Sequence, residues 1–352
     1  MRTVNYNEVL QLVCELAGFT YSTTPTETLL RLRGHISRRF RSIWECDYWP
    51  ELTRVQERHY RGDYASGTAY SAPTATSSTE VFYPPTKAYY QVLRSSTGNA
   101  PATLSGGTYT TNTAYWFDAQ GAYTGNDWAA STAYTVGTVV RLPDDNRYYA
   151  CHTAHTSGGT FDTTKFGILT PFDKYIAYEQ TGQTAIGEVR DVFTRDPRIN
   201  RNFAAANWTL STNGVQVPDG PAIVWLEFRT RFKPLVGDDY SASTAYAVGD
   251  QILFNSSGSV KNFYECVSAT SAGQNPNTHA AKWSLIEIPY LFQPYLVTGA
   301  FADYLIMDGQ MDKAAAQDRI AEQYLADELQ KLHDLQPQYQ RLAVSAAYAP
   351  SL

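Results

Sequence analysis

The chain has 352 residues and a formal net charge of −6, so it lacks the overall positive field that draws proteins to nucleic acid. It contains no apolar run of about eighteen residues, which excludes a conventional membrane-spanning helix, and the N-terminal sequence MRTVNYNEVL lacks the apolar stretch of a signal peptide. Charged residues make up only 18% of the chain, whereas tyrosine occurs 26 times, and this composition favours β-structure with exposed hydroxyl groups.

The first predicted element is a helix over residues 5–17. Asn5 and Glu8 fit a capping pair at its start, because each side chain can bond the backbone N–H of the other residue. Val9, Val13 and Leu16 then recur at helical spacing, and the glycine that follows the helix at position 18 fits a C-terminal stop.

A second, longer helix is predicted from Thr24 to about Asp47. The sequence Thr24-Pro25-Thr26-Glu27 matches a capping box with proline at the first helical position. Apolar residues then follow at spacings of three and four, which places one stripe on one face of the helix: Leu29, Leu32, Ile36, Phe40 and Ile43.

The second helix also carries a basic run that includes Arg31, Arg33, His35, Arg38, Arg39 and Arg41. This run fits a solvated face, a salt-bridge surface toward another subunit, or a contact with DNA. Glu45, Asp47 and Glu51 offset the charge soon afterwards, which disfavours DNA. As candidate contacts with a neighbouring subunit we take Arg31, Arg38, Arg39 and Arg41.

From residue 62 onward the sequence becomes rich in Tyr, Thr, Ser and Gly, and one pattern occurs three times. The clearest copies read WAASTAYTVGTVVRL from Trp128 and YSASTAYAVGDQILF from Tyr240, and a fainter copy starts at Tyr64. The aligned tyrosines form two sets, Tyr70, Tyr134 and Tyr246, and Tyr90, Tyr149 and Tyr264.

The second and third copies agree more closely with each other than with the first. They share Gly137 with Gly249, and Cys151 with Cys266. In the first copy Pro73 stands where this alignment expects the glycine of the tight turn, so we expect a looser match there. Each copy predicts a small β-module of about fifty residues.

A different β-region separates the second and third modules. Residues 176–182, 185–195 and 222–232 read as strands, and the last of them alternates clearly. Its sequence places Val224, Leu226 and Phe228 on one face.

Helical periodicity returns after Pro289. Residues 291–307 are mostly apolar, a turn follows at Asp308-Gly309, and residues 310–333 predict a long polar helix in which Asp327 and Lys331 can pair. Pro337 should end this helix, and residues 337–352 form a tail without visible periodicity. One side of the long helix carries Ala314, Ala321, Leu325, Leu329 and Leu332.

The predicted fold class is α+β, with one discontinuous body and three inserted all-β modules. The body consists of an N-terminal helical part, a β part and a C-terminal helical part, which are residues 1–61, 171–236 and 288–336. The inserted modules are residues 62–122, 123–170 and 237–287. Surface loops tolerate such insertions at small entropic cost.

Neither metal binding nor catalysis is indicated by the sequence. The four cysteines lack zinc spacing, and Cys151 and Cys266 occupy one position in two modules, which predicts small buried residues in a reducing compartment. Glycine-rich spots such as Ser105-Gly106-Gly107 read as turns, because they lack the residues of a phosphate loop. We therefore expect no cofactor and no enzymatic activity.

The modules resemble small chitin- and cellulose-binding modules of bacterial glycosidases. The resemblance rests on STAYTVG with YYACHT in the second module and on STAYAVGD with FYECVS in the third, and it implies that Trp283 and Phe166 are closing core residues. Sugar binding in that family uses exposed aromatic residues after the central strand, whereas this chain has His152-Thr153 and Val267-Ser268 there. Candidate glycan contacts are Trp128, Tyr148 and His152.

The remaining segments resemble head-to-tail adaptor proteins of tailed bacteriophages. The resemblance is carried by four stretches in the family's order, residues 32–53, 186–200, 224–234 and 301–329. It implies a ring, twelvefold in that family, between the portal and the tail, with DNA passing through the lumen without specific binding. The expected partners are further copies of the chain, the portal protein and downstream neck or tail proteins.

The resemblance also implies a location at the head–tail interface of the virion, after assembly in the host cytoplasm and without a membrane. In this reading, contacts with the portal or between subunits use Arg31, Arg38, Arg39, Arg41, Leu325, Leu329 and Leu332. The alternative is a glycan-binding tail or adhesion protein, in which the three modules carry the function.

Overall fold

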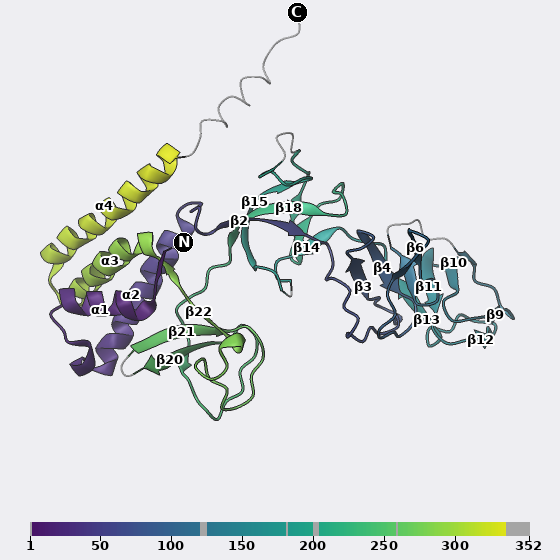
Figure 1. Ribbon diagram of the computed structural model, residues 1–352, viewed down its shortest axis with the longest axis horizontal. Helices are drawn as coiled ribbons and strands as arrows, with labels where there is room; N and C mark the ends of the chain where they lie inside the picture. The colour runs from purple at the N-terminus through teal and green to yellow at the C-terminus, as the bar shows by residue number, and fades with distance from the viewer. Residues whose placement is uncertain (1, 120–124, 181, 200–203, 258–259, 336–352) are drawn as a thin grey trace, which may run out of the picture. The chain divides into compact units, whose positions relative to one another are not determined.

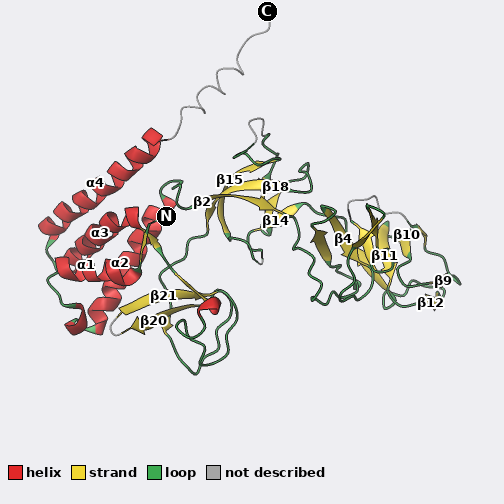
Figure 2. Cartoon of the chain, viewed as in Figure 1, coloured by secondary structure: helices red, strands yellow, loops and turns green. Residues whose placement is uncertain are grey.

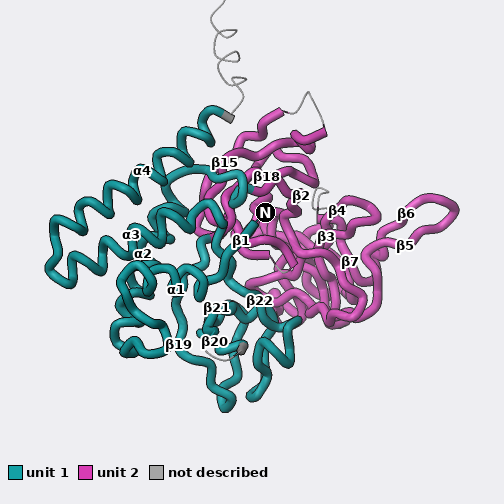
Figure 3. Tube along the Cα trace, turned by 60° about the vertical axis from the view of Figure 1, so that its left-hand side comes forward, with its two compact units in different colours: residues 1–53, 232–352 teal, residues 54–231 magenta. Residues whose placement is uncertain are grey.

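A computed structural model describes residues 2–119, 125–180, 182–199, 204–257 and 260–335 (Figure 1). The fold is mixed α+β, as predicted, with helices toward both ends of the chain and strands between them (Figure 2). The chain divides into two compact units. Unit 1 comprises residues 1–53 and 232–352, and unit 2 comprises residues 54–231 (Figure 3). None of the described helices is long and apolar enough to cross a bilayer.

Unit 1 contains the four α-helices. They are α1 (Tyr6–Leu16), α2 (Thr26–Glu45), α3 (Gln293–Met307) and α4 (Met311–Leu335). Three short 3-10 turns, Tyr21–Thr23, Ala280–Lys282 and Tyr290–Phe292, also belong to this unit. The N-terminal segment meets the segment before α3 in a small sheet, in which β1 (Thr3–Val4) pairs antiparallel with β23 (Ile288–Pro289). The N-terminal and C-terminal helices therefore share one core.

The helical stripe predicted on α2 is confirmed, whereas Leu16, predicted to continue the stripe of α1, is 50% exposed. On α2 the side chains of Leu32, Ile36, Phe40 and Ile43 are buried, and Leu29 packs against them. The capping pair of α1 is also confirmed, since the N–H of Glu8 donates to Asn5 Oδ1 and the N–H of Asn5 donates to Glu8 Oε2.

Two local predictions are wrong. The capping box of α2 does not form, because Pro25 itself occupies the N-cap position and the Thr24 hydroxyl donates to the carbonyl of Thr20, 2.9 Å away. On α4, Lys331 pairs with Glu328 instead of Asp327, which accepts a hydrogen bond from Gln323. The predicted helix end at Pro337 and the tail lie outside the described residues.

The third module belongs to unit 1. Its sheet runs in the order β19 (Asp238–Asp239), β20 (Gln251–Ser257), β21 (Val260–Cys266) and β22 (Trp283–Leu285). Phe263 packs edge-on against Tyr6 at 4.9 Å, and the N–H of Asn7 donates to Asn262 Oδ1 at 3.0 Å. The module therefore supplies part of the core of the helical unit.

Unit 2 combines the first two modules with the predicted β part of the body. The β part forms two sheets of three strands, ordered β15-β18-β2 and β14-β17-β16. Their bounds are β2 (Thr53–Arg58), β14 (Tyr175–Ala177), β15 (Ile186–Phe193), β16 (Thr209–Leu210), β17 (Gly214–Gln216) and β18 (Val224–Thr230). The alternation predicted for β18 is confirmed, because Val224, Leu226 and Phe228 are all buried.

The two modules of unit 2 each form their own sheet. The first contains β3 (Glu80–Tyr83), β4 (Ala88–Val92) and β7 (Trp116–Asp118), with a separate hairpin of β5 (Ala102–Ser105) and β6 (Thr108–Thr111). The second contains β8 (Asn126–Asp127), β10 (Val139–Leu142), β11 (Arg147–Cys151) and β13 (Phe166–Leu169), with β9 (Ala133–Tyr134) paired to β12 (His155–Thr156).

The compact units thus follow other boundaries than the predicted body and inserts. Residues 171–231 lie in the unit of the first two modules, whereas the third module lies with the helices. Side-chain packing explains these boundaries. The third module contributes Leu253, Phe263 and Ile286 to the helical core, whereas Phe82 and Tyr89 of the first module pack into the core of the β part.

All three modules share one topology. A hairpin is flanked on one side by a short parallel segment and on the other by an antiparallel closing strand. In the first module the parallel segment is the single bridge from Asp63 to Phe82. The registers place Tyr90, Tyr149 and Tyr264 at equivalent positions, opposite Val81, Val140 and Ile252.

The other aligned tyrosines make the same hydrogen bonds in every module. The hydroxyl of Tyr134 accepts from the N–H of Ala129 at 2.8 Å and donates to the carbonyl of the same residue. Tyr70 and Tyr246 do the same with Ala65 and Ser241. Each tyrosine therefore closes a loop of five residues onto its own module core, and the predicted equivalence of these tyrosines is confirmed.

One aromatic residue closes each module core. Tyr246 meets Trp283 edge-on at 5.4 Å, and Tyr134 meets Phe166 at the same separation, as the alignment predicts. In the first module Trp116, which the sequence did not single out, meets Tyr70 in the same way. These closing residues lie opposite Cys266, Cys151 and Val92.

The alignment at Pro73 is wrong. Gly137 and Gly249, with φ of 91° and 93°, donate backbone hydrogen bonds to Cys151 and Cys266, and the N–H groups of these cysteines bond the residue after each glycine. In the first module the N–H of Val92 bonds Thr79, so the residue equivalent to the glycines is Ser78. Ser78 lies eight positions after Tyr70, against three positions in the other modules, and the first module therefore has five extra residues there.

The extra residues join the first module to the second. The N–H of Ile168 on β13 donates to the carbonyl of Thr74 at 2.7 Å, and Ser78 bonds Thr170 through their hydroxyls at 3.0 Å. At Gly167 a Cβ atom would lie 2.2 Å from the carbonyl oxygen of Pro73. Only glycine at this position lets the two backbones approach so closely.

Gly167→Ala should therefore destabilise unit 2, because the Thr74 segment must withdraw from β13 and its hydrogen bond is lost. We expect a loss of about 1–3 kcal/mol, the range for overpacked sites, in urea unfolding followed by fluorescence. Gly159→Ala is the control, because its Cβ would meet no atom within 4 Å. Equal effects of the two substitutions would contradict the close approach.

Candidate assembly interface

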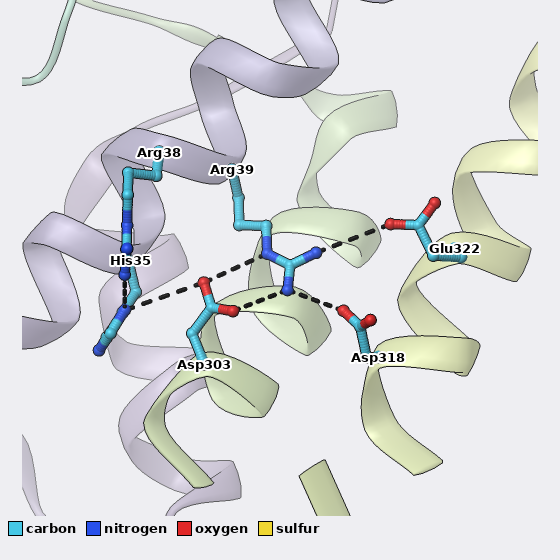
Figure 4. Close-up of polar contacts among 6 residues, drawn as sticks. All are labelled: His35, Arg38, Arg39, Asp303, Asp318 and Glu322. Carbon is cyan, nitrogen blue, oxygen red and sulfur yellow. Dashed lines mark hydrogen bonds and ion pairs between the residues drawn. The ribbon is translucent and has the colours of Figure 1, made fainter. Parts of the chain in front are cut away.

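One arginine connects three of the helices in unit 1. Arg39 on α2 donates from Nε to Asp303 Oδ2 at 3.2 Å and from Nη2 to Asp303 Oδ1 at 2.7 Å, which makes a two-pronged ion pair with α3 (Figure 4). The same Nη2 donates to Asp318 on α4 at 2.7 Å, and Glu322 lies 3.7 Å from Nη1. Gly299 on α3 leaves room for the arginine stem.

The environment of Arg39 favours its charged form. Its side chain is 16% exposed, and this burial alone would lower the pKa of the guanidinium. The hydrogen bonds to Asp303, Tyr295 and Asp318 outweigh the burial and hold the pKa above its ordinary value. Arg39 therefore lies inside the helical layer and contributes to the fold of its own chain, whereas the sequence suggested a contact with another subunit.

His35 lies one turn before Arg39 and faces the same cluster (Figure 4). Its Nδ1 is 2.6 Å from Arg38 Nη2 and 3.8 Å from Asp303 Oδ2. Burial lowers the pKa of the imidazole, Arg38 and Arg39 lower it further, and Asp303 opposes them. His35 is therefore held in its neutral form in the folded protein.

The other candidate arginines lie on the outer side of α2. Arg31 pairs with Glu27 and Arg41 pairs with Glu45, one turn away along the helix in both cases. Arg38, Arg31 and Arg41 are exposed, so they remain available for contacts outside the chain. Arg31 also donates to Met307 Sδ at 3.4 Å, which places the start of α2 beside the end of α3.

The leucines predicted for subunit contacts pack within their own chain. Leu332 is buried in the core of unit 1, and Leu325 and Leu329 pack against that core. Ala314 and Ala321 are buried on the same side of α4, so the predicted stripe is confirmed as a buried face. These three leucines are therefore used within the chain and not in the predicted contacts with another subunit.

An apolar surface lies at one end of the helical layer. The contact of Arg31 with Met307 brings the start of α2 to the end of α3, and Phe19, just after α1, packs edge-on against Tyr304 at 5.4 Å. We call this surface the apolar end. Its large exposed side chains are Leu16 (50% exposed), Leu30 (49%), Ile306 (48%), Met307 (42%) and Met311 (62%).

The loop that borders the apolar end carries no charge. No Asp, Glu, Lys or Arg occurs from Leu16 to Thr26. Scattered exposed leucines are common on protein surfaces, but a group of several large exposed apolar side chains is typical of a surface that another protein covers. Spacing alone does not reveal this surface, because Leu16 continues the stripe of α1 and the other members do not recur at helical spacing along one helix.

The candidate glycan contacts do not form a common surface. Trp128 packs edge-on against Phe161 in the core of the second module, at 5.9 Å. Tyr148 lies on the opposite face of the sheet, where it packs with Leu93 and Phe117 of the first module. His152 follows β11, and its Nδ1 lies 3.1 Å from the hydroxyl of Thr153.

The chemistry of the modules is that of packed cores. Cys151 and Cys266 are buried, and burial raises the pKa of both thiols, which keeps them protonated. Among the described residues no cluster of three or more His, Cys, Asp or Glu side chains could hold a metal ion.

Comparisons with protein-family models, curated proteins and solved structures find no match to this chain. The arrangement of side chains in the two units is therefore the basis for any statement about function.

Arg39→Met should destabilise unit 1 by about 3 kcal/mol, because it leaves Asp303 buried without its cationic partner. The free energy of unfolding from urea titration measures the effect. Arg41→Met removes an exposed pair and should cost less than about 1 kcal/mol. Similar losses for the two variants would show that the cluster does not anchor the helices.

The lowered pKa of His35 predicts a stability that depends on pH. The unfolded chain binds the proton more tightly than the folded chain, so the contribution is complete above about pH 6.5 and declines as the pH falls toward the folded-state pKa. His35→Gln should lack this decline. Urea unfolding of both proteins at about pH 7.5 and pH 5 gives the difference, and a difference independent of pH would contradict the assignment.

Proposed function

We propose that the chain is a structural virion protein of a tailed double-stranded DNA phage, a head-to-tail adaptor that forms a ring between the portal and the tail. The observation that carries this proposal is the apolar end of the helical layer. It gives each copy a surface whose burial requires a neighbouring protein. The resemblance of residues 32–53 and 301–329 to adaptor proteins supports the same reading.

A ring needs two different surfaces on each copy. A heterologous contact joins one surface to another and closes when the rotation between copies is right. The apolar end supplies one surface. For the other we assign the outward side of α4, where Ile320 and Tyr324 lie one turn apart and are both exposed.

The electrostatics fit a ring through which DNA passes. The net charge of −6 offers no attraction to phosphates, so DNA in the lumen would move without being held. The partners in this proposal are further copies of the chain, the portal protein and the next protein of the neck or tail. The place of action is the head–tail interface of the virion, after assembly in the host cytoplasm.

The modules have structural roles in this proposal. The third is part of the helical core, and the first two hold each other through the Thr74 segment and Gly167. A glycan-binding adhesin remains the alternative outcome of the experiment. Replacing residues 238–286 with a linker would not distinguish the two functions, because it removes Phe263 from the helical core.

The apolar end can be tested without disturbing the core. Leu16→Lys with Met311→Lys places two charges on exposed positions, so the chain should fold but require at least about tenfold more protein to form rings, the factor that corresponds to 1.4 kcal/mol. Sedimentation velocity and negative-stain electron microscopy measure this. Val248→Lys with Val267→Lys is the matched control, since both valines are exposed in the third module.

Rings in both double variants at the same concentration would show that the apolar end is not the interface. An intact chain that stays monomeric at every concentration would overturn the ring. Monomers that bind a neutral polysaccharide would favour the adhesin.

A further inference from the structure

The hairpin of β5 and β6 stands apart from the sheet of its module. Its strands pair from Ala102 with Thr111 to Ser105 with Thr108. Gly106 and Gly107 form the turn with φ of 59° and 85°, the left-handed values that a two-residue hairpin turn requires. Figure 3 shows the hairpin extending away from the rest of unit 2, and within the described part of the chain its sheet has two strands.

The hairpin is an insertion relative to the sister modules. The paired residues that close each module are 24 positions apart in the first, Val92 with Trp116. They are 15 apart in the second, Cys151 with Phe166, and 17 apart in the third, Cys266 with Trp283. The first module thus has seven to nine more residues here, although all three cores close in the same way.

The two outer edges of the hairpin present backbone groups in a defined order. The N–H of Asn112 donates to the carbonyl of Pro101 at 2.8 Å, which fixes the alternation of the ladder. Bonded pairs then fall at Thr103 with Thr110 and at Ser105 with Thr108. The N–H and C=O groups of Leu104 and Tyr109 consequently point outward, one residue on each edge.

These edges lack the charged side chains that often prevent strand pairing. All residues from Thr103 to Thr110 are exposed, and no charged residue occurs from Ser95 to Phe117. Proteins usually protect an open edge with lysine, proline or a bulge. Leu104 and Tyr109 also pair across the hairpin as an apolar patch, with 60% and 41% of their surfaces exposed.

We propose that the hairpin pairs with the same hairpin of neighbouring copies, β6 of one copy against β5 of the next. Because β5 and β6 run in opposite directions, hairpins that point the same way around a ring form one continuous antiparallel sheet. Each copy uses each edge once, and the closed ring leaves no edge unpaired. This inference rests on the proposed ring.

A second copy is the occupant that the edges select. A partner must present backbone N–H and C=O groups in the matching order on an uncharged strand. The strand β5 of a second copy presents such groups to β6. An isolated two-stranded hairpin is marginally stable in water, whereas added strands stabilise it. The hairpin would thus gain its order from assembly.

The test is hydrogen exchange of the full-length chain, measured by mass spectrometry, as rings and after dilution to monomers. Exchange at the amides of Leu104 and Tyr109 should be slowed at least about tenfold in rings. Leu104→Pro removes an outward N–H and leaves the bonded pairs intact, so it should abolish the protection of Tyr109.

Leu210→Pro is the matched control. Leu210 on β16 is 63% exposed, and the adjacent Ser211 and Gly214 exchange backbone hydrogen bonds, so the N–H of Leu210 also points outward. This variant should keep the protection of the hairpin. Rings whose hairpin amides exchange as fast as in monomers would overturn the inference and leave the adaptor proposal standing. A chain that forms no ring would overturn both.

Discussion

The ion cluster around Arg39 fixes how three helices of unit 1 lie against one another. On either side of Asp318 the buried side chains of α4 are small, Ala314 and Ala321, and such side chains could slide along a helix with little penalty. A two-pronged bond to Asp303 permits one position only, because both oxygens must meet the guanidinium. Buried ion pairs add little net stability, but they can select one register. Asp318 and Glu322 remain partly hydrated, and water screens their charges. Three carboxylates can therefore lie around the single cation of Arg39.

The helices could be predicted from the sequence because their periodicity is local. The stripe on α2 and the buried face of α4 follow from spacing alone. What each face contacts is not local. Arg39 looks like the other arginines of its run, and only the fold places it opposite Asp303. Asp318 and Glu322 lie one turn apart beside Ala321, and two acidic residues next to a buried position can indicate a cation inside the fold. The sequence does not show which helix supplies that cation.

The modules could be aligned from sequence wherever a residue type is required by geometry. Glycine at 137 and 249 has positive φ, and each tyrosine hydroxyl must reach the same backbone five residues earlier. The alignment failed at Pro73, where the first module has extra residues that bond another module. The unit boundaries were missed for a similar reason, because Phe263 looks like a module core residue and packs on the helices instead.

The contact between the first two modules has a direction. One partner is the long segment around Thr74, whose carbonyl accepts the hydrogen bond, and the other is the strand with glycine at 167, which donates it. The second module has only two residues between Tyr134 and Gly137 and lacks such a segment, while the third has Ser284 where the strand needs glycine. Stacking by this contact therefore stops after one step. The repeated sequence therefore forms one joined pair of modules and one separate module. It cannot form a longer stack, because no further module has both the segment and the glycine that this contact needs.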